Sequence, residues 1–168
     1  MNSSNYSSSD QFLHNLFLGK TDLSNFLYER IKNYKKSNKK VFKVFISGLA
    51  RSGTTALLNQ IFSSNKFGSL KYSHMPFILN PRLSEIFSSI SKKGEIKSQE
   101  RIHQDGININ INSPECLDEP FWIKENPNYF SEEINTNRKY NIETLENYDK
   151  LLTRHSIFQD KNKFIIKN

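Results

Sequence analysis

The sequence predicts an α/β fold in which a parallel sheet is flanked by helices, and three observations carry this prediction. Residues 41–46 (VFKVFI) form a short β-branched and aromatic run, typical of a buried strand. The glycine loop SGLARSG (47–53) follows, and apolar residues then recur at helical spacing over 57–62. KFIIK (163–167) is a further apolar strand. Strand, loop and helix in this order open an α/β unit.

The length of 168 residues suits one domain, expected over 10–168 after a Ser/Asn-rich, disordered tail at 1–9. One cysteine cannot pair within the chain, which excludes a disulfide scaffold. The longest apolar runs fall well short of the roughly 18 residues that a membrane span needs, and the N-terminus is too polar and broken for a signal peptide. We therefore expect a cytoplasmic protein with no transmembrane segment.

The positive charge is concentrated in the first half of the chain. Residues 1–93 hold 14 Lys/Arg and 4 Asp/Glu, whereas residues 94–168 hold 10 and 13. A basic half suits an anionic ligand, because summed charge gathers counter-ions in clefts. A solvated helix end and linker over Lys32 to Lys40 would explain the same charge without any ligand.

The remaining elements follow from periodicity and turn residues. Helical spacing predicts helices over 12–17, 23–31, 81–90 and 142–152, with Asn80 as N-cap and Pro81 as first helical residue. The stretch SLKYS (69–73) predicts a second strand, and INININ (107–112) a half-exposed one. Ser113-Pro114 is expected to begin a short helix that Pro120 interrupts. Because the chain stops directly after a strand, we expect it to be the N-terminal part of a longer protein.

The loop Gly48-Leu-Ala-Arg-Ser-Gly53-Thr54-Thr55 carries most of the functional argument. Its glycines allow close approach of the backbone to a ligand, and it opens a helix whose first N–H groups are unpaired. Such a helix start binds anions, and Arg51 adds a guanidinium suited to phosphate or sulfate oxygens. A strand-to-helix turn would also use Gly, Ser and Thr for turn and capping reasons alone.

The spacing is similar to the nucleoside-triphosphate loop G-x-x-x-x-G-K-[ST], but Thr54 stands where that loop has its lysine. The lysine normally reaches the β- and γ-phosphates, so its absence argues against phosphoryl transfer. A kinase or other nucleotide binder with a P-loop-like fold would need Mg²⁺ and a lysine from elsewhere, such as Lys71.

The stretch FISGLARSGTTALL resembles the phosphosulfate-binding loop of sulfotransferases that use 3′-phosphoadenosine 5′-phosphosulfate, which reads [KR]-[SG]-G-T-[TS] between a strand and a helix. That family's fold is related to the P-loop kinases. Its loop also lacks the lysine of the triphosphate loop. The resemblance covers roughly residues 41–122 and implies an incomplete sulfotransferase fold with a P-loop-like parallel sheet. It implies that the donor is bound by Gly48, Arg51, Ser52, Gly53, Thr54 and Thr55.

A second segment, Tyr72-Ser-His74-Met-Pro76, is similar to the K-T-H-[LF]-P segment of cytosolic members. The resemblance implies that His74 is the general base and Arg51 the catalytic cation of the loop. The family's lysine maps onto Tyr72, which is a departure. Some branches use a carboxylate as base, and Asp105 is a candidate for it.

Two later stretches extend the resemblance. RIHQDGININ followed by SPECLDEPFW looks like a region of bacterial members. KFIIKN resembles the strand that precedes the family's 3′-phosphate site, and the element that carries that site is not in this sequence. The chain would thus hold half of the donor pocket.

The reaction implied by the resemblance moves a sulfuryl group to a hydroxyl or amine of a small-molecule, carbohydrate or lipid acceptor. It needs no metal, and no metal-ligand spacing links the histidines (His14, His74, His103 and His155). No nucleic-acid partner is expected from this reading. A third hypothesis, a basic module for nucleic acid, rests on the charge of residues 1–93, but no aromatic-basic motif accompanies it.

Structural explanations stand beside the candidate residues. His74 would suit a strand end, and an Asp-Gly turn accounts for His103 and Asp105. Acids favour the first turn of a helix, which accounts for Glu115 and Glu119. The remaining three are explained by burial in a core: Cys116, Phe121 and Trp122.

Overall fold

The computed structural model describes residues 22–49, 51–75, 77–91, 98–100, 106–125 and 141–167. In chain order the elements are α2 (Asp22–Lys32), β1 (Phe42–Ile46), α3 (Thr54–Phe62), the 3₁₀ turn η1 (Tyr72–His74), α4 (Pro81–Ser91), β2 (Gln99–Glu100), β3 (Asn108–Ile109), α5 (Glu119–Glu125), α6 (Ile142–Phe158) and β4 (Lys163–Lys167). The predicted tail at 1–9, the predicted helix at 12–17, His14, His103 and Asp105 lie outside the described residues.

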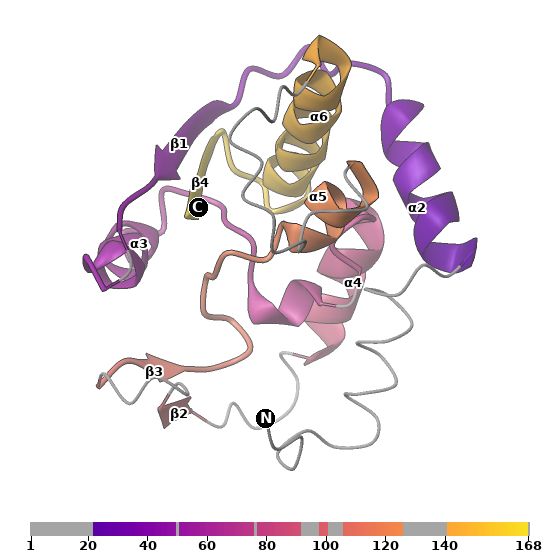
Figure 1. Cartoon of the computed structure of the whole chain (residues 1–168). Helices are drawn as coiled ribbons and strands as arrows, with labels where there is room; N and C mark the ends of the chain where they lie inside the picture. The colour runs from indigo at the N-terminus through magenta and orange to yellow at the C-terminus, as the bar shows by residue number, and fades with distance from the viewer. Residues whose placement is uncertain are drawn as a thin grey trace, which may run out of the picture.

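β1 and β4 form a parallel pair, with Phe42 opposite Lys163 and Ile46 opposite Lys167. The fold is mixed, with this small parallel sheet flanked by helices, as expected (Figure 1). Successive β4 residues point to opposite faces. Ile165 packs with Leu58 of α3, whereas Phe164 and Ile166 belong to the larger cluster that includes Leu151 of α6.

A third extended segment lies on the other side of β4. Gly68 pairs with Phe164 in parallel: its N–H donates to the Lys163 carbonyl (2.8 Å), and its carbonyl accepts from Ile165 (2.9 Å). A Cβ on Gly68 would lie 3.1 Å from the Phe164 ring, so the close approach favours glycine. β4 is therefore central, with β1 on one side and residues near Gly68 on the other.

Four expectations need correction. The predicted strand at 69–73 is wrong: Gly68 and Lys71 form only isolated bridges, and the chain then turns into η1, where Tyr72 and Ser73 donate to carbonyls of a neighbouring segment. The strand of INININ is only Asn108–Ile109, paired antiparallel with β2. No helix begins at Ser113; α5 begins at Glu119, with Pro120 in its first turn, where a missing N–H costs nothing.

The fourth correction concerns burial. β1 was expected to be buried, but Phe42 is 64% and Phe45 48% exposed. In α4 the helix and its Asn80 cap are confirmed, since Leu83 N–H donates to Asn80 Oδ1 (3.1 Å). Its apolar residues Ile86 and Ile90 are nevertheless exposed. The buried side carries serines, because Ser84 donates to the Phe77 carbonyl (2.5 Å) and Ser88 meets Ser73 (2.8 Å).

Candidate functional site

The loop after β1 is exposed and sharply curved. Gly48, Leu49, Arg51, Ser52 and Gly53 are all exposed. Arg51 and Gly53 adopt left-handed backbone conformations, with φ of 65° and 83°. This conformation costs a residue with a Cβ about 1–2 kcal/mol, so it favours glycine at position 53.

The N-terminus of α3 is open toward this loop. The first hydrogen bond of the helix runs from Leu57 N–H to the Gly53 carbonyl (3.0 Å), so the amides of 54–56 have no carbonyl within the helix. Because the N-cap residue is Gly53, it has no side chain that could cap these amides, and no side-chain cap hydrogen bond forms. The positive end of the helix dipole and these amides together favour an anion.

The structure adds a cation that sequence reasoning missed. Lys167, the last residue of β4, donates from Nζ to Thr55 Oγ1 (2.9 Å) and forms an ion pair with Glu115. Thr55 is in the first turn of α3 and is buried (6% exposed). The signal in the sequence was the lysine at the end of a predicted strand, since the carboxyl ends of neighbouring parallel strands meet at one sheet edge.

Glu115 reaches this edge through the segment that precedes α5. Its N–H donates to the Leu70 carbonyl (3.1 Å), and Pro114 bridges Lys71 in antiparallel fashion. Glu115 was expected in the first turn of a helix; it lies instead in an extended segment beside β4. The edge of the sheet therefore brings together the start of α3, the end of β4 and the carboxylate of Glu115.

His74 lies in a separate buried network. Its Nδ1 accepts from the Lys71 N–H (3.2 Å), so Nε2 carries the proton and donates to Glu85 Oε1 (2.7 Å). The ring is fully buried and stacks on His155, with centroids 5.3 Å apart. Lys71, the lysine considered for a nucleotide, is 3.6 Å from the same carboxylate of Glu85.

Burial, hydrogen bonding and charge within this network shift the pKa values of Glu85 and His155. Burial alone would raise the pKa of the Glu85 carboxyl, but the hydrogen bond from His74 and the charge of Lys71 outweigh it and hold that pKa below its usual range. Burial, with a smaller contribution from His74, lowers the pKa of His155 to about 3. His155 therefore stays neutral, with Nε2 donating to the Ile78 carbonyl (2.8 Å).

The remaining candidate residues, Cys116, Phe121 and Trp122, have packing or electrostatic surroundings that need no ligand to explain them. Phe121 is fully buried, and Trp122 packs partly buried against the same core, as expected. Burial, together with the nearby Asp118 carboxylate, raises the pKa of the Cys116 thiol to about 12. Across the described ranges no three His, Cys, Asp or Glu side chains gather as a metal site requires. No helix in those ranges is long and apolar enough to cross a bilayer.

Comparisons with known proteins give no relative for this chain. No family model, curated protein or solved structure matches the chain.

Proposed function

We propose that the loop and the start of α3 bind the phosphosulfate group of 3′-phosphoadenosine 5′-phosphosulfate, and that the chain is a sulfotransferase with a P-loop-like fold. The single observation that supports this most is the Lys167 ammonium at Thr55, beside an exposed and uncapped helix N-terminus. Amides, hydroxyls and two cations are the donor set that an anionic group requires.

The residues present fit such a group. Gly53 leaves the approach open, since a Cβ there would meet nothing within 4 Å. Arg51 and Ser52 are exposed beside it, and Thr54 is half-buried. Arg51 would neutralise charge on the bound group, while the amides of 54–56 would orient it. The acceptor would be a hydroxyl or amine of a small molecule, carbohydrate or lipid.

The donor, when bound, supplies the sulfuryl group: the acceptor oxygen or nitrogen bonds to sulfur, the bond from sulfur to the phosphate oxygen breaks, and the acceptor's proton passes to a base. His74 stays a prediction for that base. Because both of its ring nitrogens have protein partners, an acceptor would have to displace the Lys71 amide from Nδ1. Glu115, which forms an ion pair with Lys167 beside Thr55, is an alternative base in this proposal.

Isothermal titration with adenosine 3′,5′-bisphosphate, the product of the donor, tests the binding proposal. We expect binding that Arg51→Ala weakens about tenfold or more, because charged hydrogen bonds contribute about 1.5–3 kcal/mol. Lys66→Ala, an exposed lysine in the loop after α3, is the matched control. No binding, or equal loss in both variants, would contradict the proposal.

One observation favours a second candidate, a nucleotide-binding protein of the P-loop-like class. Lys167 supplies at the helix start the ammonium group that the loop lacks, since Thr54 stands in place of the lysine of a triphosphate loop. The same titration with ATP and Mg²⁺ separates the two. Tighter binding of Mg-ATP than of adenosine 3′,5′-bisphosphate would favour this candidate.

A further inference from the structure

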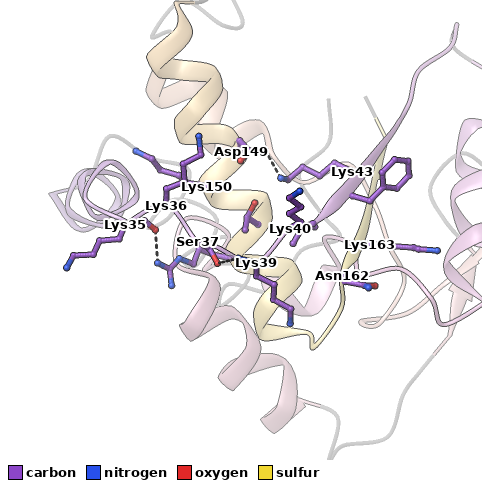
Figure 2. A pocket seen from close by; sticks show the side chains of 14 residues that line it. Lys35, Lys36, Ser37, Lys39, Lys40, Lys43, Asp149, Lys150, Asn162 and Lys163 are labelled. Carbon is purple, nitrogen blue, oxygen red and sulfur yellow. Dashed lines mark hydrogen bonds and ion pairs between the residues drawn. The ribbon is translucent and has the colours of Figure 1, made fainter.

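A basic groove lies at the edge of the sheet opposite the loop. It has a volume of about 660 Å³ and is lined by the linker after α2, one side of α6, and the first residues of β1 and β4 (Figure 2). Val41 and Phe42 begin one strand, and Asn162 and Lys163 the other, so the groove lies at their amino ends. It is therefore distinct from the site at the carboxyl ends.

Cations from three separate parts of the chain converge in this groove. The linker and the start of β1 contribute five lysines: Lys35, Lys36, Lys39, Lys40 and Lys43. Helix α6 contributes Lys150 and Arg154, and β4 contributes Lys163. The one carboxylate among the described lining residues is Asp149. A lysine-rich linker alone would not require cations of α6 and β4 at the same place.

Contacts between α6 and the linker after α2 hold the groove in shape. Arg154 Nη2 donates to the Lys35 carbonyl (3.0 Å), and its guanidinium lies 5.1 Å from the Tyr34 ring centroid. Lys150 Nζ donates to the Lys32 carbonyl (3.3 Å). These contacts fix the linker against α6, so a ligand would meet a formed surface, with little further ordering cost.

Several cations remain available to a ligand. Within the described part of the chain, the ammonium groups of Lys35, Lys36 and Lys40 have neither an ion pair nor a hydrogen bond. Among the described partners of the groove lysines, Asp149 lies 2.6 Å from Lys43 (Figure 2) and Asp160 lies 4.0 Å from Lys39. Mutual repulsion of these charges falls when a polyanion binds.

An exposed aromatic ring stands among the lysines. Phe42, 64% exposed, lines the groove and is flanked in sequence by Lys40 and Lys43. A ring of this kind offers a surface on which an unpaired base can stack. The fold adds the cations of α6 and β4 to this short aromatic-basic stretch, an arrangement that the linear sequence does not show.

We propose that this groove binds single-stranded nucleic acid, with phosphates on the lysines and a base on Phe42. A duplex keeps its bases stacked and offers none to this ring. A planar bilayer contacts projecting surfaces, whereas these cations line a hollow. This proposal differs from the expectation of no nucleic-acid partner, and it is independent of the sulfotransferase proposal because the two sites lie at opposite ends of the sheet's strands.

Fluorescence anisotropy with a labelled 12-nucleotide dT strand tests the proposal. We expect the logarithm of the affinity to fall with the logarithm of salt by about 0.7 per phosphate contacted, or roughly 3 for four contacts. Lys35→Ala/Lys36→Ala/Lys40→Ala should weaken binding at least tenfold. Phe42→Ala should weaken it about fivefold or more, as loss of one stacked base does. Circular dichroism checks that both variants fold.

Two control variants and two competing ligands make the test decisive. Lys66→Ala/Arg82→Ala/Lys124→Ala removes the same charge from residues that do not line the groove and should change affinity less than threefold. Arg51→Ala should leave strand binding unchanged, which separates this proposal from that for the loop. Equal losses in the two triple variants, absence of strand binding at 50 mM salt, or equal or tighter binding of a blunt duplex or of phosphatidylserine vesicles would each overturn it.

Discussion

The Nζ of Lys167 lies 2.9 Å from the Oγ1 of Thr55. This contact joins the last residue of the central strand to the first turn of the helix after the loop. Because Lys167 also pairs with Glu115, its ammonium is held in place by two side chains. A positioned cation beside the amides of the helix start is the arrangement on which the proposed anion site depends.

Lys167→Met should weaken binding of adenosine 3′,5′-bisphosphate about tenfold or more, because it removes one charged donor. Lys163→Met, at the other end of the same strand, should leave that affinity unchanged. The double variant Lys167→Met/Glu115→Gln should regain stability, since it leaves no carboxylate without its partner, but not affinity. Affinity regained in the double variant, by calorimetry, would show that Lys167 acts only on the fold.

Gly53→Ala should lower the free energy of unfolding by about 1–2 kcal/mol, because position 53 has φ of 83°. In thermal denaturation this corresponds to a melting temperature lower by about 2–8 °C for a chain of this size. Gly53→Asn should cost less, since asparagine tolerates this conformation better. An equal loss for both substitutions would mean that backbone strain is not the cause.

The sequence predicted the positions of helices and strands better than the burial and long-range contacts of their side chains. The strand, loop and helix around Gly48–Thr55, the capped helix at Asn80 and the strand 163–167 are confirmed, since each has a local signal. Helical periodicity could not show that α4 turns its serines inward, because Ser84 and Ser88 find their partners in the irregular segment before the helix. Nor could short-range patterns bring Lys167 to Thr55, which is 112 positions away. The roles of His74 and Arg51 stay predictions.

Stability should fall as the pH drops below about 6.5. The pKa of His155 is lowered to about 3 in the fold, so the unfolded chain binds the extra proton between pH 6.5 and 3. In that window this residue should cost up to about 1.4 kcal/mol per pH unit. His155→Gln keeps a donor for the Ile78 carbonyl and removes the titration. Urea midpoints between pH 7.5 and 4.5 should therefore fall less steeply in this variant; an unchanged slope would refute the assignment.

Glu85→Ala should destabilise the fold strongly, by about 3–5 kcal/mol, because it leaves buried Lys71 without its carboxylate. Glu29→Ala, which removes an exposed ion pair with Lys32, should change stability by less than about 1 kcal/mol. Chemical denaturation measures both. Similar small losses would show that the network of His74, Lys71 and Glu85 contributes little to stability.

Cys116 should react slowly with a thiol reagent in the native protein. Burial and the Asp118 carboxylate raise the thiol pKa to about 12, so at pH 8 the thiolate is scarce. The reaction rate in urea should exceed the native rate by at least about a hundredfold. A fast native reaction would show that this segment opens readily.

Amide chemical shifts measured during titration with adenosine 3′,5′-bisphosphate test the anion site most directly. The account predicts that the largest changes fall on the amides of Gly53, Thr54 and Thr55, and that they shrink in Lys167→Met. Changes confined to residues 35–43, or none at the start of α3, would contradict it.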